Sequence, residues 1–276
     1  MVAIDPRLQI RSVTLAVSDL ARSSAFYERA LGLPLLARDE RSAQLGADRD
    51  QPALTLLQLP ASTPLPPRAT GLFHVAWLHP SRAALAESLR RIAGTGWRLE
   101  GASDHGVSEA LYLSDPDGLG IEIYADRPAE TWAHDEDGRS LRMFTEPLDL
   151  EDLLGEFTDE PGPHLAAGTR IGHIHLKVAD VPRTAAFYRD TLGLEERARL
   201  PSAAFLAAGG YHHHVGLNSW QSDGEEAAPE TAPGLRTVVF ELADHEALDA
   251  LAERVGTEAG EVRVRDPDGQ LLRFVG

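Results

Sequence analysis

The chain has 276 residues and no cysteine, which excludes disulfides, thiol nucleophiles and thiolate metal ligands. Its hydrophobic content of 43% and charged content of 25% are typical of a water-soluble globular protein. The formal charge of −17 disfavours nucleic acid as a partner, because phosphates attract concentrated basic side chains. The sequence shows neither an apolar run long enough to cross a membrane nor a secretory leader, so we expect a cytoplasmic protein without a membrane partner.

The first predicted unit is a strand, a helix and further strands. Apolar side chains alternate with small or polar ones over residues 13–17, as in a half-buried strand. A helix is expected from Leu20 to about Ala30, with Ser18 or Asp19 as its N-cap and Gly32 as its end. Two more strands are expected over 42–45 and 53–59.

A second unit follows a proline-rich segment. It begins with a strand over 71–77 and an amphipathic helix over 82–94. Strands near Leu99 and over 110–113 lead into an Asp-Pro-Asp-Gly turn, and a last strand covers 121–124.

Both units occur again in the second half of the chain. Asp19, Phe26 and Leu31 return as Asp180, Phe187 and Leu192 at one constant spacing, which indicates a duplication. We therefore expect four βαβββ modules, beginning near residues 12, 72, 171 and 235. They form two tandem domains, at 9–127 and 170–276, and the connector at 128–169 should contain a helix within 148–157.

Four stretches resemble the vicinal oxygen chelate superfamily, which includes glyoxalase I, extradiol dioxygenases and bleomycin- or fosfomycin-resistance proteins. They are 105–116, 120–128, 172–176 and 208–218. Within the superfamily, the chain is most similar to the bacterial two-domain catechol-2,3-dioxygenase group. The resemblance covers nearly the whole chain. It implies an α+β fold in which paired modules curl into half-open, mixed-sheet barrels.

The resemblance also implies that metal ligands come from the first and last strands of the modules. The residues at these positions, in chain order, are Ser12, Gln58, His74, Glu122, His173, Asn218, Thr237 and Arg273. If the modules pair in chain order, each barrel has an incomplete set of ligands. If modules two and three share a barrel, His74, Glu122 and His173 converge as the two-histidine, one-carboxylate triad of non-haem iron oxygenases. The distribution of ligand residues favours this second pairing, or an equivalent convergence across a dimer interface.

A run of three histidines supplies further candidates. On a strand, His212, His214 and Asn218 would face one side and His213 the other. We therefore expect His214 to act as a catalytic acid–base, and His212 and Asn218 to contact substrate.

Two residues near the expected triad are also catalytic candidates. Tyr124 lies two positions after Glu122 and should share its face of the strand. His105 is the other candidate, although it could equally be an ordinary turn residue.

The leading functional hypothesis is extradiol cleavage of a catechol. A divalent metal, with Fe(II) as first choice and Mn(II), Zn(II) or Ni(II) as alternatives, would bind a small aromatic substrate and O₂. The second hypothesis is a glyoxalase-type isomerase or lyase, against which Asn218 speaks because a second glutamate is expected there. The third is a non-catalytic protein that binds an aromatic compound or antibiotic. The resemblance also allows a homodimer.

Overall fold

The computed structural model describes residues 3–47, 51–136, 138, 140–258 and 260–276. The first module is a strand, a helix that continues into a π-helical turn, and three strands: β1 (Gln9–Val17), α1 (Leu20–Phe26), η1 (Tyr27–Leu31), β2 (Leu35–Arg38), β3 (Ser42–Gly46) and β4 (Pro52–Gln58). The second module has the same order without the π-helical turn: β5 (Gly71–His79), α2 (Arg82–Thr95), β6 (Gly101–Asp104), β7 (Ser108–Ser114) and β8 (Gly120–Asp126).

The described residues of the connector form three short elements: η2 (Ala129–Thr131), β9 (Glu146–Pro147) and α3 (Leu150–Gly155). The third module repeats the first, including its π-helical turn: β10 (Arg170–Lys177), α4 (Val181–Ala186), η3 (Phe187–Thr191), β11 (Glu195–Leu200), β12 (Ala203–Ala207) and β13 (Val215–Asn218). In the fourth module, the described residues form two strands after the helix: β14 (Gly234–Glu241), α5 (His245–Val255), β15 (Val262–Arg265) and β16 (Leu271–Val275).

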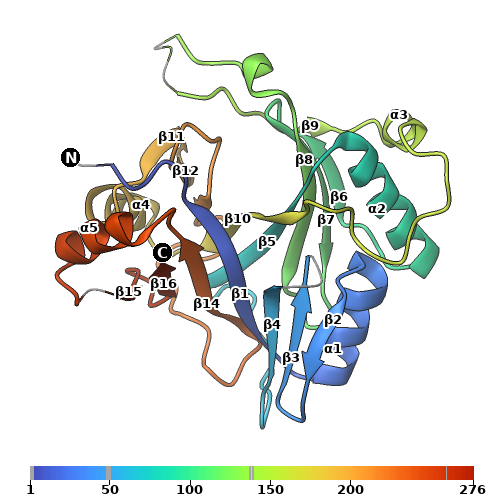
Figure 1. Cartoon of the computed structure of the whole chain (residues 1–276), viewed down its shortest axis with the longest axis horizontal. Helices are drawn as coiled ribbons and strands as arrows, with labels where there is room; N and C mark the ends of the chain where they lie inside the picture. The colour runs from blue at the N-terminus through green and yellow to red at the C-terminus, as the bar shows by residue number, and fades with distance from the viewer. Residues whose placement is uncertain (1–2, 48–50, 137, 139, 259) are drawn as a thin grey trace.

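Two mixed sheets are built from these strands (Figure 1). The seven-stranded sheet has the order β15-β16-β14-β1-β4-β3-β2, and the nine-stranded sheet the order β11-β12-β13-β10-β5-β8-β7-β6-β9. Modules one and four therefore share one sheet, and modules two and three share the other. The pairing favoured by the ligand distribution is confirmed, and pairing in chain order is wrong.

The centre of the nine-stranded sheet is the antiparallel pair of β5 and β10. In its register His175 lies opposite His74, and His173 lies opposite Ala76. Almost every residue of the two strands is buried, as expected for central strands covered on both faces. The helices lie at the two sides of the molecule, with α1 and α2 at one side and α4 and α5 at the other (Figure 1). This arrangement brings two histidines from opposite halves of the chain onto neighbouring strands.

A tyrosine–aspartate hydrogen bond links the two sheets in each half of the chain. Tyr27, in the π-helical turn, donates to Asp115 at 3.2 Å, and Tyr188 donates to Asp266 at the same distance. These aspartates are the first residues of the two Asp-Pro-Asp-Gly turns. Each also accepts hydrogen bonds from backbone N–H groups of its own turn. Burial raises the pKa of both carboxyl groups to about 6.

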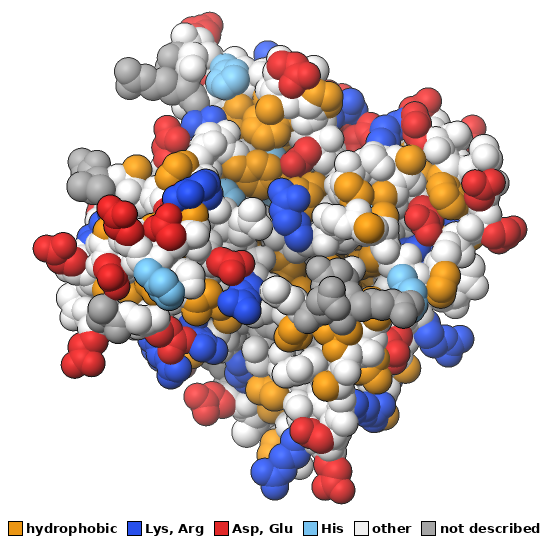
Figure 2. Space-filling view, viewed as in Figure 1, with side chains coloured by type: hydrophobic (Ala, Val, Ile, Leu, Met, Phe, Trp, Pro, Cys, Tyr) orange, Lys and Arg blue, Asp and Glu red, His pale blue; other side chains and the backbone are white. Residues whose placement is uncertain are grey.

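Charged side chains of both signs are interspersed over the face seen in Figure 2. Among the described residues, no helix has the length and hydropathy needed to cross a membrane.

Candidate metal centre and substrate cavity

Three donor atoms converge on the buried face of the central strands. The Nε2 atom of His74, on β5, lies 2.8 Å from the Oε2 atom of Glu122, on β8. The Nε2 atom of His173, on β10, lies 3.2 Å from the same oxygen and 3.4 Å from the Nε2 atom of His74. All three side chains are buried. The structure thus brings together the three residues expected as metal ligands.

The spacing of these donors fits a cation held at one face of an octahedron. Two ligands at right angles, each about 2.1 Å from an ion, lie about 3.0 Å apart. The three observed separations bracket this value. Both imidazole Nε2 atoms also lie within 3.2 Å of the same carboxylate oxygen, and if both rings donated to it, neither would have a lone pair for the 3.4 Å contact between them, whereas a shared cation would bind all three atoms.

The protonation states suit metal binding as well. Burial alone would raise the pKa of Glu122, but the imidazoles of His173 and His74 outweigh it and hold this pKa well below its usual range. Burial lowers the pKa of His173 to about 4, with Glu122 opposing the shift. A carboxylate and a neutral imidazole are the forms that bind a divalent cation.

A cavity of about 440 Å³ opens beside the donors. His74, Glu122 and Tyr112 line its polar part. The rest of the lining combines large apolar side chains with smaller polar ones and further histidines: Phe73, Met143, Phe144, Leu200, Phe205, Trp220, Ser103, Ser108, Thr145, His105, His175 and His213. Phe73 and Phe205 lie beside these groups, and both rings pack near His175, at centroid distances of 5.1 and 5.8 Å. A small aromatic molecule would fit between these walls.

His175 is a cavity residue that the sequence reasoning did not single out. Burial holds the pKa of its imidazole well below the usual range, and the ring makes a hydrogen bond to the backbone of Leu217. Its Nε2 atom is buried without a hydrogen-bond partner. If Nδ1–H donates to the Leu217 carbonyl, Nε2 carries a free lone pair. Period-two spacing from His173 along one strand was the signal that could have identified it.

The histidine run lies in the turn before β13, so the strand register expected for it is wrong. His213, not His214, lines the cavity, and its ring lies 4.0 Å from that of His173. His212 is buried between Asp126, at 2.9 Å, and His213, at 2.7 Å. His214 accepts the backbone N–H of Ala208 and does not line the cavity.

The contacts of His212 constrain both of its neighbours. Asp126 accepts from Nε2–H of His212, and in the neutral form of this imidazole Nδ1 is then an acceptor. His213 must then donate through its own Nδ1–H, because the two Nδ1 atoms are hydrogen-bonded. This arrangement leaves Nε2 of His213 as its unprotonated nitrogen.

His105 lies at the edge of the cavity and ties together two of its walls. Its Nε2 atom is 2.6 Å from the hydroxyl of Tyr112, and its Nδ1 atom is 2.8 Å from the backbone oxygen of Phe144 in the connector. The neighbouring Gly106 has a φ of +76°, and a Cβ there would lie 2.5 Å from the Phe144 ring. His105 is thus both a turn residue and a cavity residue.

Tyr124 and Asn218 are buried but do not line the cavity. Tyr124 packs behind His173, with ring centroids 4.9 Å apart, and its hydroxyl lies 2.8 Å from that of Tyr211. Asn218 accepts the backbone N–H of Trp220 at 3.3 Å. Their contacts therefore support the walls of the site.

Gly216, rather than Asn218, occupies the position related to Glu122. Across neighbouring strands, Glu122 on β8 lies opposite Ala76, which follows His74 by two residues on β5. In the same way, Gly216 on β13 lies opposite His175, which follows His173 by two residues on β10. A Cβ at Gly216 would lie 2.9 Å from the His175 ring. The space in which a fourth ligand side chain would begin is thus filled by an imidazole.

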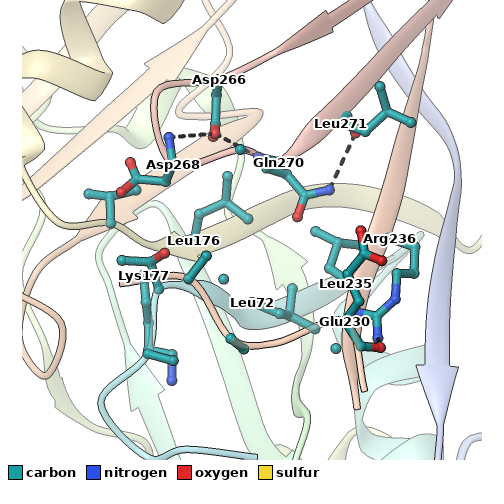
Figure 3. A pocket seen from close by; sticks show the side chains of 18 of the residues that line it. Leu72, Leu176, Lys177, Glu230, Leu235, Arg236, Asp266, Asp268, Gln270 and Leu271 are labelled. Carbon is teal, nitrogen blue, oxygen red and sulfur yellow. Dashed lines mark hydrogen bonds between the residues drawn. The ribbon is translucent and has the colours of Figure 1, made fainter. Parts of the chain in front are cut away.

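A second cavity, of about 240 Å³, is lined by residues of both sheets (Figure 3). Three of its polar side chains are already engaged with the backbone: Asp266 and Asp268 accept hydrogen bonds from N–H groups, and Arg236 donates to two carbonyls. The first cavity, with its cluster of donor atoms, is therefore the candidate functional site.

This chain is similar to several known proteins. It is 42% identical over its full length to the full length of catechol-2,3-dioxygenase from Bacillus subtilis (strain 168). Another Bacillus subtilis protein, described as a dioxygenase, has a solved structure with a TM-score of 0.63 at 15% identity, over 99% of this chain and 86% of the other. Glyoxalase I from Zea mays matches with a TM-score of 0.56 at 18% identity, over 97% and 92%.

A sequence model of the Glyoxalase/Bleomycin resistance protein/Dioxygenase superfamily matches residues 9–123 and 170–274. The two matched segments correspond to the two halves of the duplication. The chain therefore belongs to the Glyoxalase/Bleomycin resistance protein/Dioxygenase superfamily.

Proposed function

We propose that this protein is a metal-dependent extradiol dioxygenase that cleaves the ring of a catechol. The observation that carries the proposal is the convergence of His74, His173 and Glu122 beside an aromatic-lined cavity. Identity of 42% to a catechol-2,3-dioxygenase along the whole chain supports it.

His74, His173 and Glu122 would hold the metal, for which Fe(II) is our first choice. When bound, a ferrous ion supplies the redox chemistry with O₂ and leaves open positions for the two catechol oxygens. The chain's own contribution is to orient the ring and to keep water away from it.

His175 and His213 are the candidates for moving the catechol protons. Both line the cavity, and the hydrogen bonds described above leave Nε2 of each ring as the unprotonated nitrogen. Either atom could accept a hydroxyl proton from a bound catechol and later return it. We assign this role to these two histidines in place of His214, which does not line the cavity.

Tyr112 is placed to accept a hydrogen bond from bound substrate, because its own hydroxyl donates to Nε2 of His105, whose Nδ1–H donates to the Phe144 carbonyl. Burial, followed by the charge of Glu122, raises the pKa of its hydroxyl well above the usual range, so the group stays protonated. Phe73 and Phe205 offer apolar surfaces for the ring. A cytoplasmic location, the absence of nucleic-acid and membrane partners, and a homodimer remain predictions.

The test begins with anaerobic loading of Fe(II), followed by catechol and O₂, with the yellow ring-cleavage product as readout. We expect metal and colour in the wild type and in His245→Ala, a control at an exposed histidine of α5. His74→Ala, His173→Ala and Glu122→Ala should lose both.

Two results would contradict the proposal. Bound metal without colour across a panel of catechols would favour an isomerase or lyase. A wild type that binds no metal would favour a protein that only binds an aromatic compound.

A further inference from the structure

The mouth of the candidate site is unusually apolar for an exposed surface. Among the described residues, six large hydrophobic side chains are exposed, and three of them line this one cavity. They are Phe144, Leu200 and Trp220, with 39%, 47% and 52% of their surface exposed. They come from the connector, the end of β11 and the loop after β13. Exposed apolar side chains gathered from separate segments mark a surface that contacts an apolar ligand.

The cavity is also larger than a single ring requires. Its volume is about 440 Å³, whereas a void of about 150 Å³ accommodates benzene. The donors at His74 and Glu122 would fix the hydroxyl-bearing edge of a catechol. Besides Phe144, Leu200 and Trp220, the lining includes the apolar Met143 and Phe205, together with the uncharged hydroxyl side chains of Ser103, Ser108 and Thr145.

The charges of the lining residues also favour an uncharged, apolar substrate. Within the described part of the chain, the lining contains no lysine or arginine, and its one carboxylate is Glu122. A carboxylate on the substrate would therefore lose its hydration without gaining a cationic partner. The net charge of −17 adds a further, long-range penalty for an anion.

We propose that the preferred substrates are uncharged catechols with an alkyl or aryl substituent that extends towards Phe144, Leu200 and Trp220. The proposal rests on the extradiol function proposed above. It assigns substrate selection to these three residues: an apolar substituent gains contact with them, and a carboxylate substituent is excluded.

The first experiment compares kcat/KM for catechol, 3-propylcatechol, 4-propylcatechol and 3,4-dihydroxybenzoate with the Fe(II)-loaded protein. At least one propylcatechol should exceed catechol by about tenfold, since one or a few methylenes in an apolar pocket have an effect of this size. The benzoate should fall about tenfold or more below catechol. Equal values for all four, or a preference for the benzoate, would overturn the proposal while leaving the extradiol function intact.

Single substitutions test whether these residues select the substrate. Leu200→Lys should raise kcat/KM for 3,4-dihydroxybenzoate relative to catechol and lower it for the propylcatechol relative to catechol. Trp220→Ala should lower the ratio of kcat/KM for the propylcatechol to that for catechol. The matched control is Leu57→Lys, at an exposed leucine on β4 of the other sheet, which should reproduce the wild-type ratios. Wild-type ratios in Leu200→Lys and Trp220→Ala would contradict the assignment.

Binding provides a readout that does not need turnover. Calorimetric titration of the purified protein should give tighter binding of the propylcatechol than of 3,4-dihydroxybenzoate, with a negative heat-capacity change from apolar burial. If no catechol is cleaved, the extradiol function fails and this titration alone decides the selectivity. Equal or tighter binding of the benzoate would then overturn the proposal.

Discussion

His173 and His175 show how one strand supplies two chemically different imidazoles. The Nε2 atom of His173 faces Glu122 and His74, whereas that of His175 is buried without a partner beside the cavity. The difference arises from neighbours and not from burial, since both rings are buried. One ring is therefore suited to hold a cation and the other to exchange a proton with substrate.

A substitution of His175 tests whether metal binding and proton exchange belong to different histidines. We expect His175→Gln to bind the same amount of metal as the wild type, with kcat lowered by about 10²–10⁴ through loss of the acid–base group. Metal analysis and steady-state kinetics on one preparation provide the check. Loss of the metal, or an unchanged kcat, would show that the roles are not divided in this way.

For single residues, the type of chemistry that a side chain can perform is easier to predict from sequence than the direction in which it points. His74, Glu122 and His173 were identified because only these residues, among eight related positions, form a good ligand set. His213 was misplaced because period-two reasoning needs a known strand start, and β13 begins only at Val215. Tyr112 was missed because no local pattern marks it: its role depends on β7 lying beside β8.

Among the elements, β13 controls the position of His175 through Gly216. In Gly216→Ala the new Cβ would lie 2.9 Å from the imidazole, so the ring must shift. We expect kcat to fall at least tenfold, with bound metal retained, because the triad lies on other strands. Gly101→Ala is the control, since its Cβ would meet no atom closer than 3.9 Å. Wild-type kcat in Gly216→Ala would exclude a positional requirement at His175.

The Asp-Pro-Asp-Gly turns make stability depend on pH. A carboxyl pKa raised to about 6 in the folded state means that the folded protein holds the proton of Asp115 more tightly than the unfolded chain does. The stability lost through this group therefore grows as pH rises from about 4 to 6, and reaches roughly 3 kcal/mol at pH 7.

Asp115→Asn should remove this loss, since an amide oxygen can still accept the turn N–H groups and the amide N–H can donate to Tyr27. Urea unfolding at pH 4 and pH 7 should show the variant gaining stability over the wild type only at the higher pH. The exposed Asp159→Asn serves as control. A variant that is less stable than the wild type at pH 7 would show that the carboxylate itself holds the turn.

Element types were largely predictable, because strand alternation and helix capping are local. The duplication also identified corresponding elements in both halves. The π-helical turns after α1 and α4 were not foreseen, since the sequence there has ordinary helical spacing. Their tyrosines meet aspartates of the next module, a long-range contact that no local pattern encodes.

For the whole molecule, the central β5–β10 pair joins the two halves of the chain. A protease site inserted in the connector, near the exposed Asp159, should therefore leave a nicked protein that stays associated and retains metal. Size-exclusion chromatography and metal analysis after cleavage test this expectation. Separation of the fragments under native conditions would mean that the connector, and not the sheet, holds the halves together.

The same strand pair determines when during synthesis the site can form. His74 and His173 are 99 positions apart in the chain, and the ribosome adds roughly 5–20 residues per second. For several seconds a nascent chain carries His74 and Glu122 without their partner, while β5 presents an open edge to other chains. Metal capture therefore has to wait for the second half, and a translation pause within the connector would prolong the interval in which nascent chains can pair with one another.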